Sequence, residues 1–398
     1  MELEDSQGVE HTVFPAGSTT SDARWSSDSL CLAVVVSNNP RPVQSPDRIG
    51  VAEIWLVTVV DNEVSEPRLV LQPGPADETA GEWITLGAWS PEGSRLLFWV
   101  GPQGASSQAD GLALWSLEVE TGQATRLAEK TLVTPTYQSW APDGGALAFT
   151  NGGYRSAQVG KWLSLYEVES GQIRSLIARS ELIPGAVAWS PKGDRIAFAA
   201  VRGNQTGDEW ADWMSWDNPV IQARRIYLLD PDSGQYQRLN AAEAYQDTPR
   251  WSADGEILYY VQIEGDLANL MAADPASGEA QPLPGCQIPR PPATGYYGQV
   301  DWSELYANCQ METRGSNRAL AVCLLADFLA AQTFADYLTP QNLSAWSPDG
   351  HTLAYVSTTS HNTQLPVELH FTPGIPSNTL EVLATGCGLF GSILLDLY

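Results

Sequence analysis

Short apolar runs, each bounded by residues that favour turns, follow one another along most of the chain. The run at 352–356 (Thr-Leu-Ala-Tyr-Val) comes just after a Trp-Ser-Pro-Asp-Gly segment at 346–350. Pro fixes φ for the first corner of a tight turn, Asp is favoured within the turn, and Gly supplies the positive φ that closes it. An apolar, β-branched run after such a turn is typical of a strand. The two segments together predict a β-hairpin with the Trp on its incoming strand.

This hairpin motif recurs through the chain, each time with a Trp ahead of the turn. Successive copies start 64, 51, 49 and 62 residues apart, and the last interval is 95 residues. A degenerate Asp-Trp-Ser at 301–303 divides that last interval into 51 and 44 residues. Because each Trp occupies the same place in a repeated unit, we expect these rings to be structural. They are Trp25, Trp89, Trp140, Trp189, Trp251, Trp302 and Trp346.

A second repeated turn contains an acidic residue and ends in Ser-Gly or Thr-Gly, at 118–122, 167–171, 230–234 and 274–278. Apolar strands flank it, so each unit is predicted to contain four antiparallel strands. Four strands repeating about every 50 residues predict an all-β fold, a β-propeller. Seven blades are favoured, and six are the alternative. We expect one propeller domain over 1–398, with units near 20–72, 84–128, 135–178, 184–240, 246–283, 297–339 and 341–385.

The Trp-Ser-Pro-Asp-Gly hairpin and the apolar strand after it resemble the WD40-like (PD40) repeat of the TolB-like β-propellers, over residues 20–385. Related propellers precede the hydrolase domain of prolyl-oligopeptidase-like peptidases. The resemblance implies a repeat scaffold that binds a protein or peptide partner in the periplasm or another extracytoplasmic compartment. Because the matching residues build the scaffold, the resemblance is more specific for fold than for function.

The chain is strongly acidic, because 47 acidic and 21 basic residues give a formal net charge of -26. This charge disfavours nucleic acids and anionic membranes as partners. It is compatible with cationic partners, metal ions or a salty habitat, and equally with plain solubility. The chain contains no run of about 18 apolar residues, so no transmembrane segment is predicted. The first residues lack the regions of a signal peptide, so the protein is either cytosolic or has lost a leader. We expect a monomer.

The five cysteines lack the C-x-x-C spacing of a zinc ribbon or a redox motif. Cys286 and Cys309 flank the degenerate unit and could pair in an oxidising compartment, with Cys387 as the alternative partner. Cys31 and Cys323 lie in apolar runs and are expected to be buried thiols.

The two ends of the repeat array leave ring closure ambiguous. Residues 8–16 predict a lone strand before the first unit, and in propellers such a strand often joins the last blade. The last unit nevertheless has an outer strand of its own, predicted at 379–383. The segment 319–338 has a helix-compatible composition, and we assign it to the two outer strands of the degenerate unit.

The strand order predicts where the long connections lie. In a four-stranded antiparallel meander the first and third turns share one end of the blade, and the remaining connections share the other end. The stereotyped short turns occupy the first end, and the long irregular segments occupy the second, which we call the long-loop end. Long connections in compact domains often carry function, so we predict the binding face there. The segments are 37–51, 101–111, 151–160, 202–222, 73–83 and 284–299.

One of these connections, at 202–222, places three tryptophans among four carboxylates. Aromatic rings and carboxylates together suit a sugar, a cationic group or an exposed peptide. The alternative is a loop that folds back and buries its tryptophans over the channel. The candidate binding residues are Trp210, Trp213, Trp216, Asp208, Glu209, Asp212 and Asp217, followed by Tyr296, Tyr297 and Trp83, and then by Arg41, Arg48, Tyr154 and Arg155.

Motifs for catalysis are missing, including the nucleophile elbow, the zinc-protease helix, the P-loop and the dinucleotide fingerprint. Of the four histidines, three fall in the last unit, at 351, 361 and 370. A His-rich metal centre would need ligands from several blades, so no metal is expected. We therefore predict no catalytic residue, no cofactor, and a non-catalytic propeller that binds a protein or peptide. The alternative is a hydrolase or lyase that cleaves carbohydrate or peptide with carboxylates of the same end.

Overall fold

The computed structural model contains two compact units, which we treat separately. The first comprises Met1–Ser107, Ala113–Leu127 and Gln332–Tyr398, and the second comprises Gln108–Leu112 and Ala128–Ala331. The residues that the structure describes are 2–4, 10–12, 19–28, 30–37, 52–60, 63–73, 83–101, 110–153, 160–177, 181–203, 222–291, 305, 344–346, 352–357 and 368–373.

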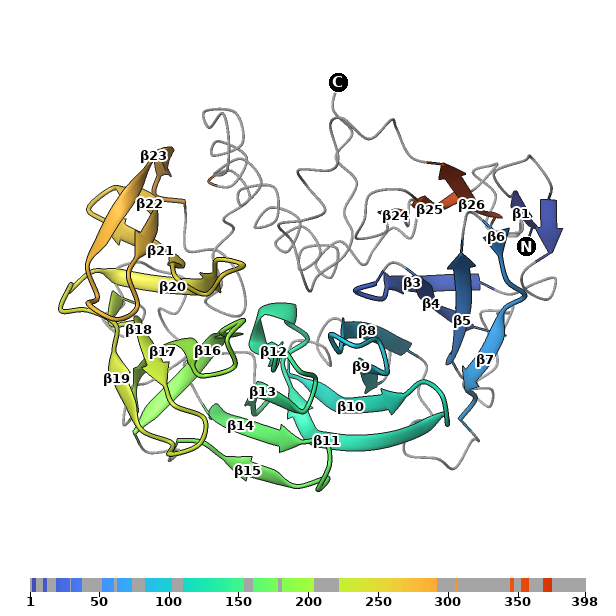
Figure 1. Cartoon of the computed structure of the whole chain (residues 1–398), viewed down its shortest axis with the longest axis horizontal. Coiled ribbons are helices and arrows are strands. Elements are labelled where there is room, and N and C mark those ends of the chain that lie inside the picture. Colours follow the sequence, from blue (N-terminus) through green and yellow to red (C-terminus); the bar gives the residue numbers. More distant parts are fainter. Residues whose placement is uncertain are drawn as a thin grey trace. The chain divides into compact units, whose positions relative to one another are not determined.

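The first unit is built from antiparallel sheets (Figure 1). One sheet has five strands: β3 (Thr19–Trp25), β4 (Cys31–Ser37), β5 (Ala52–Val60), β6 (Glu63–Val64) and β7 (Arg68–Leu71), with β6 and β7 both paired to β5. The next has the order β8 (Trp83–Trp89), β9 (Arg95–Gly101), β10 (Leu112–Glu118) and β11 (Gln123–Thr131), the last residues of β11 being grouped with the second unit. A third contains β24 (Ser344–Trp346), β25 (Thr352–Ser357) and β26 (Glu368–Pro373).

The second unit repeats the four-stranded sheet three times. The first of these sheets follows a short 3-10 helix, η1 (Pro135–Tyr137), and contains β12 (Gln138–Trp140), β13 (Ala146–Asn151), β14 (Trp162–Glu167) and β15 (Ile173–Ser175). The second contains β16 (Leu182–Trp189), β17 (Ile196–Arg202), β18 (Arg225–Leu229) and β19 (Tyr236–Arg238). The third contains β20 (Tyr245–Trp251), β21 (Leu258–Glu264), β22 (Leu267–Ala273) and β23 (Ala280–Pro289).

These sheets confirm the predicted fold class, an all-β propeller fold of four-stranded antiparallel blades. The number of blades and the single domain stay predictions, because the degenerate unit around Trp302, with 319–338, falls outside the described ranges. So does the strand predicted at 379–383. In the part of the chain that is described, no helix is both long enough and apolar enough to cross a membrane.

The prediction of a lone strand at 8–16 is wrong. The strand there, β2 (Glu10–Thr12), pairs antiparallel with β1 (Glu2–Glu4), so the start of the chain is a hairpin. Pairing satisfies backbone groups that an isolated strand would leave open. Within the first unit, β1 lies beside β26 and β24 lies beside β3.

The Trp hairpin is closed by a hydrogen-bond network that explains its sequence. Gly255 adopts φ 69° and donates its amide to the Ser252 carbonyl at 2.8 Å. The Ser252 hydroxyl accepts from the amide of Ile257 at 2.9 Å and donates to Asp254 Oδ1 at 2.6 Å. The same oxygen of Asp254 also accepts from the backbone amide of Glu256 at 3.0 Å. Ser, Asp and Gly therefore each satisfy one requirement of the turn.

The tryptophans ahead of these turns pack between neighbouring sheets. Trp25, Trp89 and Trp140 are buried, and Trp189 and Trp251 are half-buried. The Trp89 indole donates to the Arg24 carbonyl at 3.1 Å, and the Trp251 indole donates to the Ala188 carbonyl at 3.0 Å. Each of these two bonds joins one sheet to the preceding sheet. The side chain of Trp346 and the whole of Trp302 lie outside what the structure describes.

The Ser-Gly and Thr-Gly turns are also closed by glycines with positive φ, but their surroundings differ. Gly171 has φ 66° and open space around it. Gly278 has φ 76°, and a side chain there would place its Cβ 2.3 Å from the Leu239 carbonyl oxygen of the neighbouring sheet. Gly278 therefore allows close approach of two backbones as well as the turn itself.

We predict that Gly278→Ala destabilises the protein clearly more than Gly171→Ala. Both changes place alanine at a left-handed backbone position, which costs about 1–2 kcal/mol. Only Gly278→Ala adds a clash with a backbone atom, for which we expect a further loss of about 2 kcal/mol. Thermal and urea unfolding of the two variants measure the difference, and equal losses would contradict the role given to Gly278.

Candidate functional site

Most of the predicted binding residues lie beyond what the structure describes. These are Trp210, Trp213, Trp216, Asp208, Glu209, Asp212, Asp217, Tyr296, Tyr297, Arg41, Arg48, Tyr154 and Arg155. Trp83 is described: it begins β8, is half-buried, and donates its indole N–H to Thr85 Oγ1 at 3.2 Å. It pairs with Gly101 at the end of β9, and Val100 pairs with Ala113 near the start of β10. In this sheet the long connections therefore do share one end.

The connection that carries the three tryptophans leaves and re-enters the described structure at fixed points. The chain leaves at Gly203, whose amide donates to the Glu181 carbonyl at 2.8 Å. It re-enters at Gln222, whose carbonyl accepts from Arg225 Nη1 at 2.5 Å. We call these two points the feet of the insertion, and polar groups of neighbouring strands hold the second foot.

Arg224, at the second foot, forms a buried ion pair. Its Nη1 lies 3.4 Å from Oδ2 of Asp247 on β20, and both side chains are almost fully buried. The Tyr245 hydroxyl donates to the same carboxylate oxygen at 2.6 Å. Burial disfavours the charged form of Arg224, but the Asp247 carboxylate, Tyr137 and Tyr245 together outweigh it and raise the pKa of the guanidinium. Burial, and then the Asp247 carboxylate, hold the pKa of Tyr245 well above its ordinary value.

The ion pair needs a glycine on β16, a strand of the same sheet as β18. A Cβ at Gly185 of β16 would lie 2.2 Å from Nη1 of Arg224 and 3.5 Å from the Tyr137 hydroxyl. Tyr137, at the end of η1, is one of the groups that raise the pKa of the guanidinium. The Gly185 carbonyl in turn accepts from Thr150 Oγ1 at 2.7 Å. Three sheets and η1 therefore converge on one arginine.

Lys161 completes this buried charged cluster. Its side chain is 1% exposed, and its Nζ donates to the Gly153 carbonyl at 2.8 Å. Burial, and then the nearby Arg224 charge, lower the pKa of Lys161 to about 7. The amine is therefore poised between its two protonation states near neutral pH. Because it is so deeply buried, its titration changes the interior rather than an open surface.

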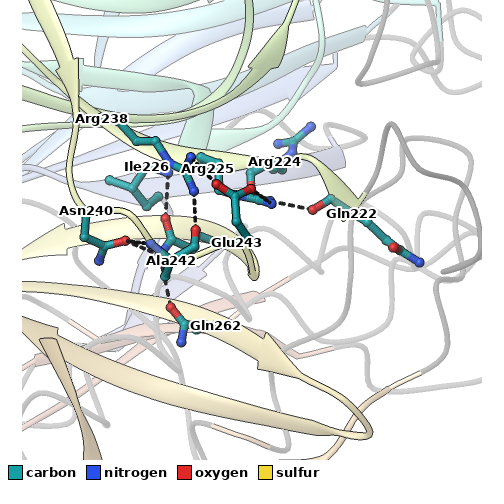
Figure 2. Close-up of polar contacts among 10 residues, drawn as sticks. Gln222, Arg224, Arg225, Ile226, Arg238, Asn240, Ala242, Glu243 and Gln262 are labelled. Carbon is teal, nitrogen blue, oxygen red and sulfur yellow. Dashed lines mark hydrogen bonds and ion pairs between the residues drawn. The ribbon is translucent and has the colours of Figure 1, made fainter.

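A second polar network surrounds Arg225, the first residue of β18 (Figure 2). The Glu243 carboxylate lies 3.2 Å from Arg225 Nη2 and 2.8 Å from Arg238 Nη1. The two arginines, Arg238 first, hold the pKa of Glu243 below its ordinary value. Arg238 also donates to the Ala242 carbonyl. This exposed carboxylate therefore joins β18 and β19 beside the second foot.

A buried glutamine connects this network to the next sheet. Gln246 Oε1 accepts from the amide of Ile226 at 3.2 Å. Its Nε2 donates to Asn240 Oδ1 at 3.1 Å and to Gln262 Oε1 at 3.0 Å. Figure 2 labels both of these partners, Asn240 and Gln262. The amide of Gln246 also donates to the Arg224 carbonyl at 3.0 Å, so both networks meet at β20.

Sequence reasoning missed the residues of this cluster. Arg224 and Arg225 form an adjacent basic pair before an apolar strand, and Lys161 is one of three lysines in the whole chain. Those two features were the available signals, but neither indicates which acidic partner an arginine will meet. Among the described residues, His, Cys, Asp and Glu side chains form no group that could hold a metal ion.

The two described cysteines are in different states. Cys286 is buried and disulfide-bonded. Its predicted partners, Cys309 and Cys387, lie outside the described ranges, as does Cys323. Cys31 is a free, half-buried thiol rather than the fully buried one expected. Burial raises its pKa, and its Sγ lies 3.8 Å from Thr58 Oγ1.

Comparison with known proteins finds no matching family model and no matching curated protein. Among solved structures, the chain is similar to TolB from Acinetobacter baumannii, with 14% identity, a TM-score of 0.36, and coverage of 86% of this chain and 59% of that one. It is similar to an oligogalacturonate lyase in complex with manganese, with 14% identity, a TM-score of 0.45, and coverage of 94% and 96%. It is also similar to dipeptidyl peptidase 4 of Porphyromonas gingivalis, with 10% identity, a TM-score of 0.44, and coverage of 69% and 41%. The chain spans 59% of the TolB structure's length. These similarities concern the fold and assign neither a family nor a function.

We predict that Asp247→Asn destabilises the protein by about 3–5 kcal/mol, because it leaves the buried Arg224 without its charge partner. The matched control is Glu167→Gln, which breaks an ion pair with Arg174 whose side chains are each 42% exposed. An exposed pair contributes less than about 1 kcal/mol, so the control should be nearly neutral. Urea unfolding of both variants measures the losses, and a small loss for Asp247→Asn would exclude a supporting role for the pair.

We also predict that Lys161 titrates near pH 7, far below Lys192. Lys192 is a built-in reference, because its hydrogen bond to Glu256 raises its pKa above the ordinary value. NMR of protein labelled with ¹³C at lysine Cε follows all three lysines, and Lys161→Met assigns the signal. A lysine of ordinary pKa is still charged at about pH 9. If the Lys161 signal shows a charged amine at that pH, the prediction is wrong.

Proposed function

We propose that this protein is a non-catalytic, TolB-like β-propeller that binds a protein or peptide through its long-loop end. The observation that carries the proposal is the second foot of the 202–222 insertion. There a buried Arg224–Asp247 pair and the Arg225–Glu243–Arg238 network fix the chain directly beside the segment that holds the three tryptophans. A rigid scaffold that presents a long, aromatic connection is a common arrangement for binding.

The charged groups of this foot support binding better than catalysis. Asp247 is engaged by Arg224 and Tyr245, and Glu243 is engaged by two arginines. Lys161 is buried against a backbone carbonyl. A catalytic acid, base or nucleophile must reach a substrate, and these side chains instead hold the chain in place. The alternative, a carbohydrate- or peptide-cleaving enzyme, rests on the carboxylates of the insertion itself.

The chemistry of the insertion indicates a partner with cationic character. Asp208, Glu209, Asp212 and Asp217 surround the three tryptophans in a chain of net charge -26. Tryptophan faces attract cations, and carboxylates accept hydrogen bonds from lysine and arginine. A basic, exposed peptide segment would satisfy both, whereas the phosphates of a nucleic acid would be repelled.

The compartment that we propose is extracytoplasmic. The disulfide at Cys286 supports this location, because disulfides persist in oxidising compartments and are rare in the cytosol. The resemblance to periplasmic TolB-like propellers points the same way. We propose a monomer as the binding form.

We expect the intact protein to capture a partner from extracytoplasmic extract of its native host and the triple variant Trp210→Ala, Trp213→Ala, Trp216→Ala to lose it. Loss of three aromatic contacts should weaken binding by at least tenfold or so. Pull-down with mass spectrometry identifies the partner, titration calorimetry gives the affinities, and thermal melting compares the folds. A parallel pull-down from cytosolic extract tests the compartment.

The matched control changes apolar residues that are exposed beside the short turns. Ile173 and Ile257 are 41% and 37% exposed, each two residues beyond a turn glycine. The double variant Ile173→Ser, Ile257→Ser should bind as the intact protein does. Equal binding by all three proteins would exclude the insertion as the site. A triple variant that melts far lower would mean that the tryptophans are core, and cleavage of glycan or peptide substrates by the intact protein would establish the enzyme alternative.

A further inference from the structure

One face of the sheet formed by β20–β23 changes in character towards the long-loop end (Figure 1). In its apolar part, Tyr260 of β21 and Met271 of β22 share a buried cluster with Ile226 of the preceding sheet. Because side chains alternate along a strand, Gln262 and Glu264 leave β21 on the same side as Tyr260. Gln262 is 3% exposed, whereas Glu264 is an exposed residue. The face therefore passes from apolar side chains, through a buried amide, to an open carboxylate.

Buried amides connect this carboxylate to the second foot of the 202–222 insertion. The backbone amide of Gln246 donates to the Arg224 carbonyl at 3.0 Å. Gln246 Nε2 donates to Gln262 Oε1 at 3.0 Å, and Gln262 Nε2 donates to Glu264 Oε1 at 2.6 Å. A surface carboxylate that accepts from a buried network of this kind is held in a defined position. Glu264 is therefore oriented from the same base that fixes the insertion.

An exposed leucine lies directly across from this carboxylate. Glu264 of β21 and Leu267 of β22 are paired in the register of the sheet, so their side chains leave it on the same face as close neighbours. Leu267 is 43% exposed. The other large apolar side chains that are exposed among the described residues follow short turns at the opposite end, and they are Leu30, Ile173 and Ile257. At the long-loop end, a fixed negative charge and an open apolar side chain therefore stand next to each other.

The connection at this point is short. β21 ends at Glu264 and β22 begins at Leu267, so Gly265 and Asp266 alone join the two strands. Gly265 has φ 61° and open space around it. The corresponding connection of the preceding sheet is the 202–222 insertion. A two-residue turn cannot fold back over the face beside it, so it leaves Glu264 and Leu267 uncovered.

Arginines hold the neighbouring exposed carboxylates, but Glu264 is held differently. Asp266 Oδ1 lies 3.2 Å from Arg290 Nη2, and Glu243 lies between two arginines. Glu264 accepts from a neutral amide instead. That hydrogen bond fixes the carboxylate without neutralising it, so its negative charge can be met by a cation from outside the protein.

We propose that Glu264 and Leu267 form a subsite of the binding face, which takes a lysine or arginine of the partner together with an adjoining apolar side chain. The carboxylate accepts hydrogen bonds from the cationic group, and the leucine covers the apolar neighbour. An exposed ion pair alone contributes little, so recognition needs both contacts. The inference rests on the proposed function and deepens it, because it names the element of the partner that is read beside the insertion.

An array of immobilised decapeptides tests the subsite with the intact, full-length protein. The array presents Arg-Leu and Lys-Leu pairs in random flanking sequences, and matched peptides in which the basic residue is Glu or the leucine is Ser. We expect the basic–apolar peptides to bind up to about fivefold more strongly than either set of matched peptides. Glu264→Gln should remove the preference for the basic residue and keep the preference for leucine. Leu267→Ser should do the reverse.

The matched controls change similar residues at the opposite end of the same sheet. Glu279→Gln removes an exposed carboxylate, and Ile257→Ser removes an exposed apolar side chain, 37% accessible. Both controls should keep the preferences of the intact protein. All four changes are at exposed positions, so thermal melting should change little. Absence of a basic–apolar preference in the intact protein, or its survival in Glu264→Gln and Leu267→Ser, would overturn the subsite.

The capture experiment separates this failure from that of the proposed function. A native partner that is lost by the tryptophan triple variant but retained by Glu264→Gln and Leu267→Ser would leave the proposed function standing and overturn the subsite. If the triple variant keeps the partner and both single variants lose it, the subsite stands and the insertion is not the site.

Discussion

Packing of one sheet face against the next is the constraint on which the rest of each unit depends. In the second unit, one apolar cluster joins Ala148 and Leu163 of one sheet to Val187 and Phe198 of the next. A single four-stranded sheet cannot bury its faces alone, so a repeat of this kind is stable only against neighbours. The backbone carbonyls that accept from Trp89 and Trp251 belong to the preceding sheet, so the same packing also orients the indoles.

This packing separates the two ends of each blade in chemical character. At one end the Ser-Asp-Gly and Ser-Gly turns are closed by short-range hydrogen bonds that recur from repeat to repeat. At the other end the connections differ, and their feet are held by groups that come from other sheets. Arg224 is the clearest example, because its partners lie on β20 and in η1 and the space it fills is left by Gly185. A buried charge of this kind is stable only while every partner is in place. The connections at the long-loop end can therefore vary in sequence, whereas the buried residues that hold their feet cannot.

The buried cluster also joins structure to chemistry near neutral pH. Desolvation of Lys161 and its proximity to Arg224 bring an amine of ordinary basicity into the physiological range. The amine donates to the Gly153 carbonyl, so it ties the two ends of the connection between β13 and β14 to each other. The buried Arg224–Asp247 pair and the lowered pKa of Lys161 have the same physical origin. That origin is the free-energy cost of placing a charge in a tightly packed protein interior.

The amino-acid sequence by itself determined the repeat, the turns and the four strands of each blade. These features are local: Ser252, Asp254 and Gly255 specify their turn through bonds that span only a few residues. The sequence also singled out the 202–222 insertion by its composition. Only the tertiary structure decided that Arg224 and Asp247 meet, because Asp247 lies on another sheet and no periodic pattern encodes that contact. The pairing of β1 with β2 escaped prediction for a similar reason, since those short polar strands carry no apolar alternation and are defined by their backbone partners alone.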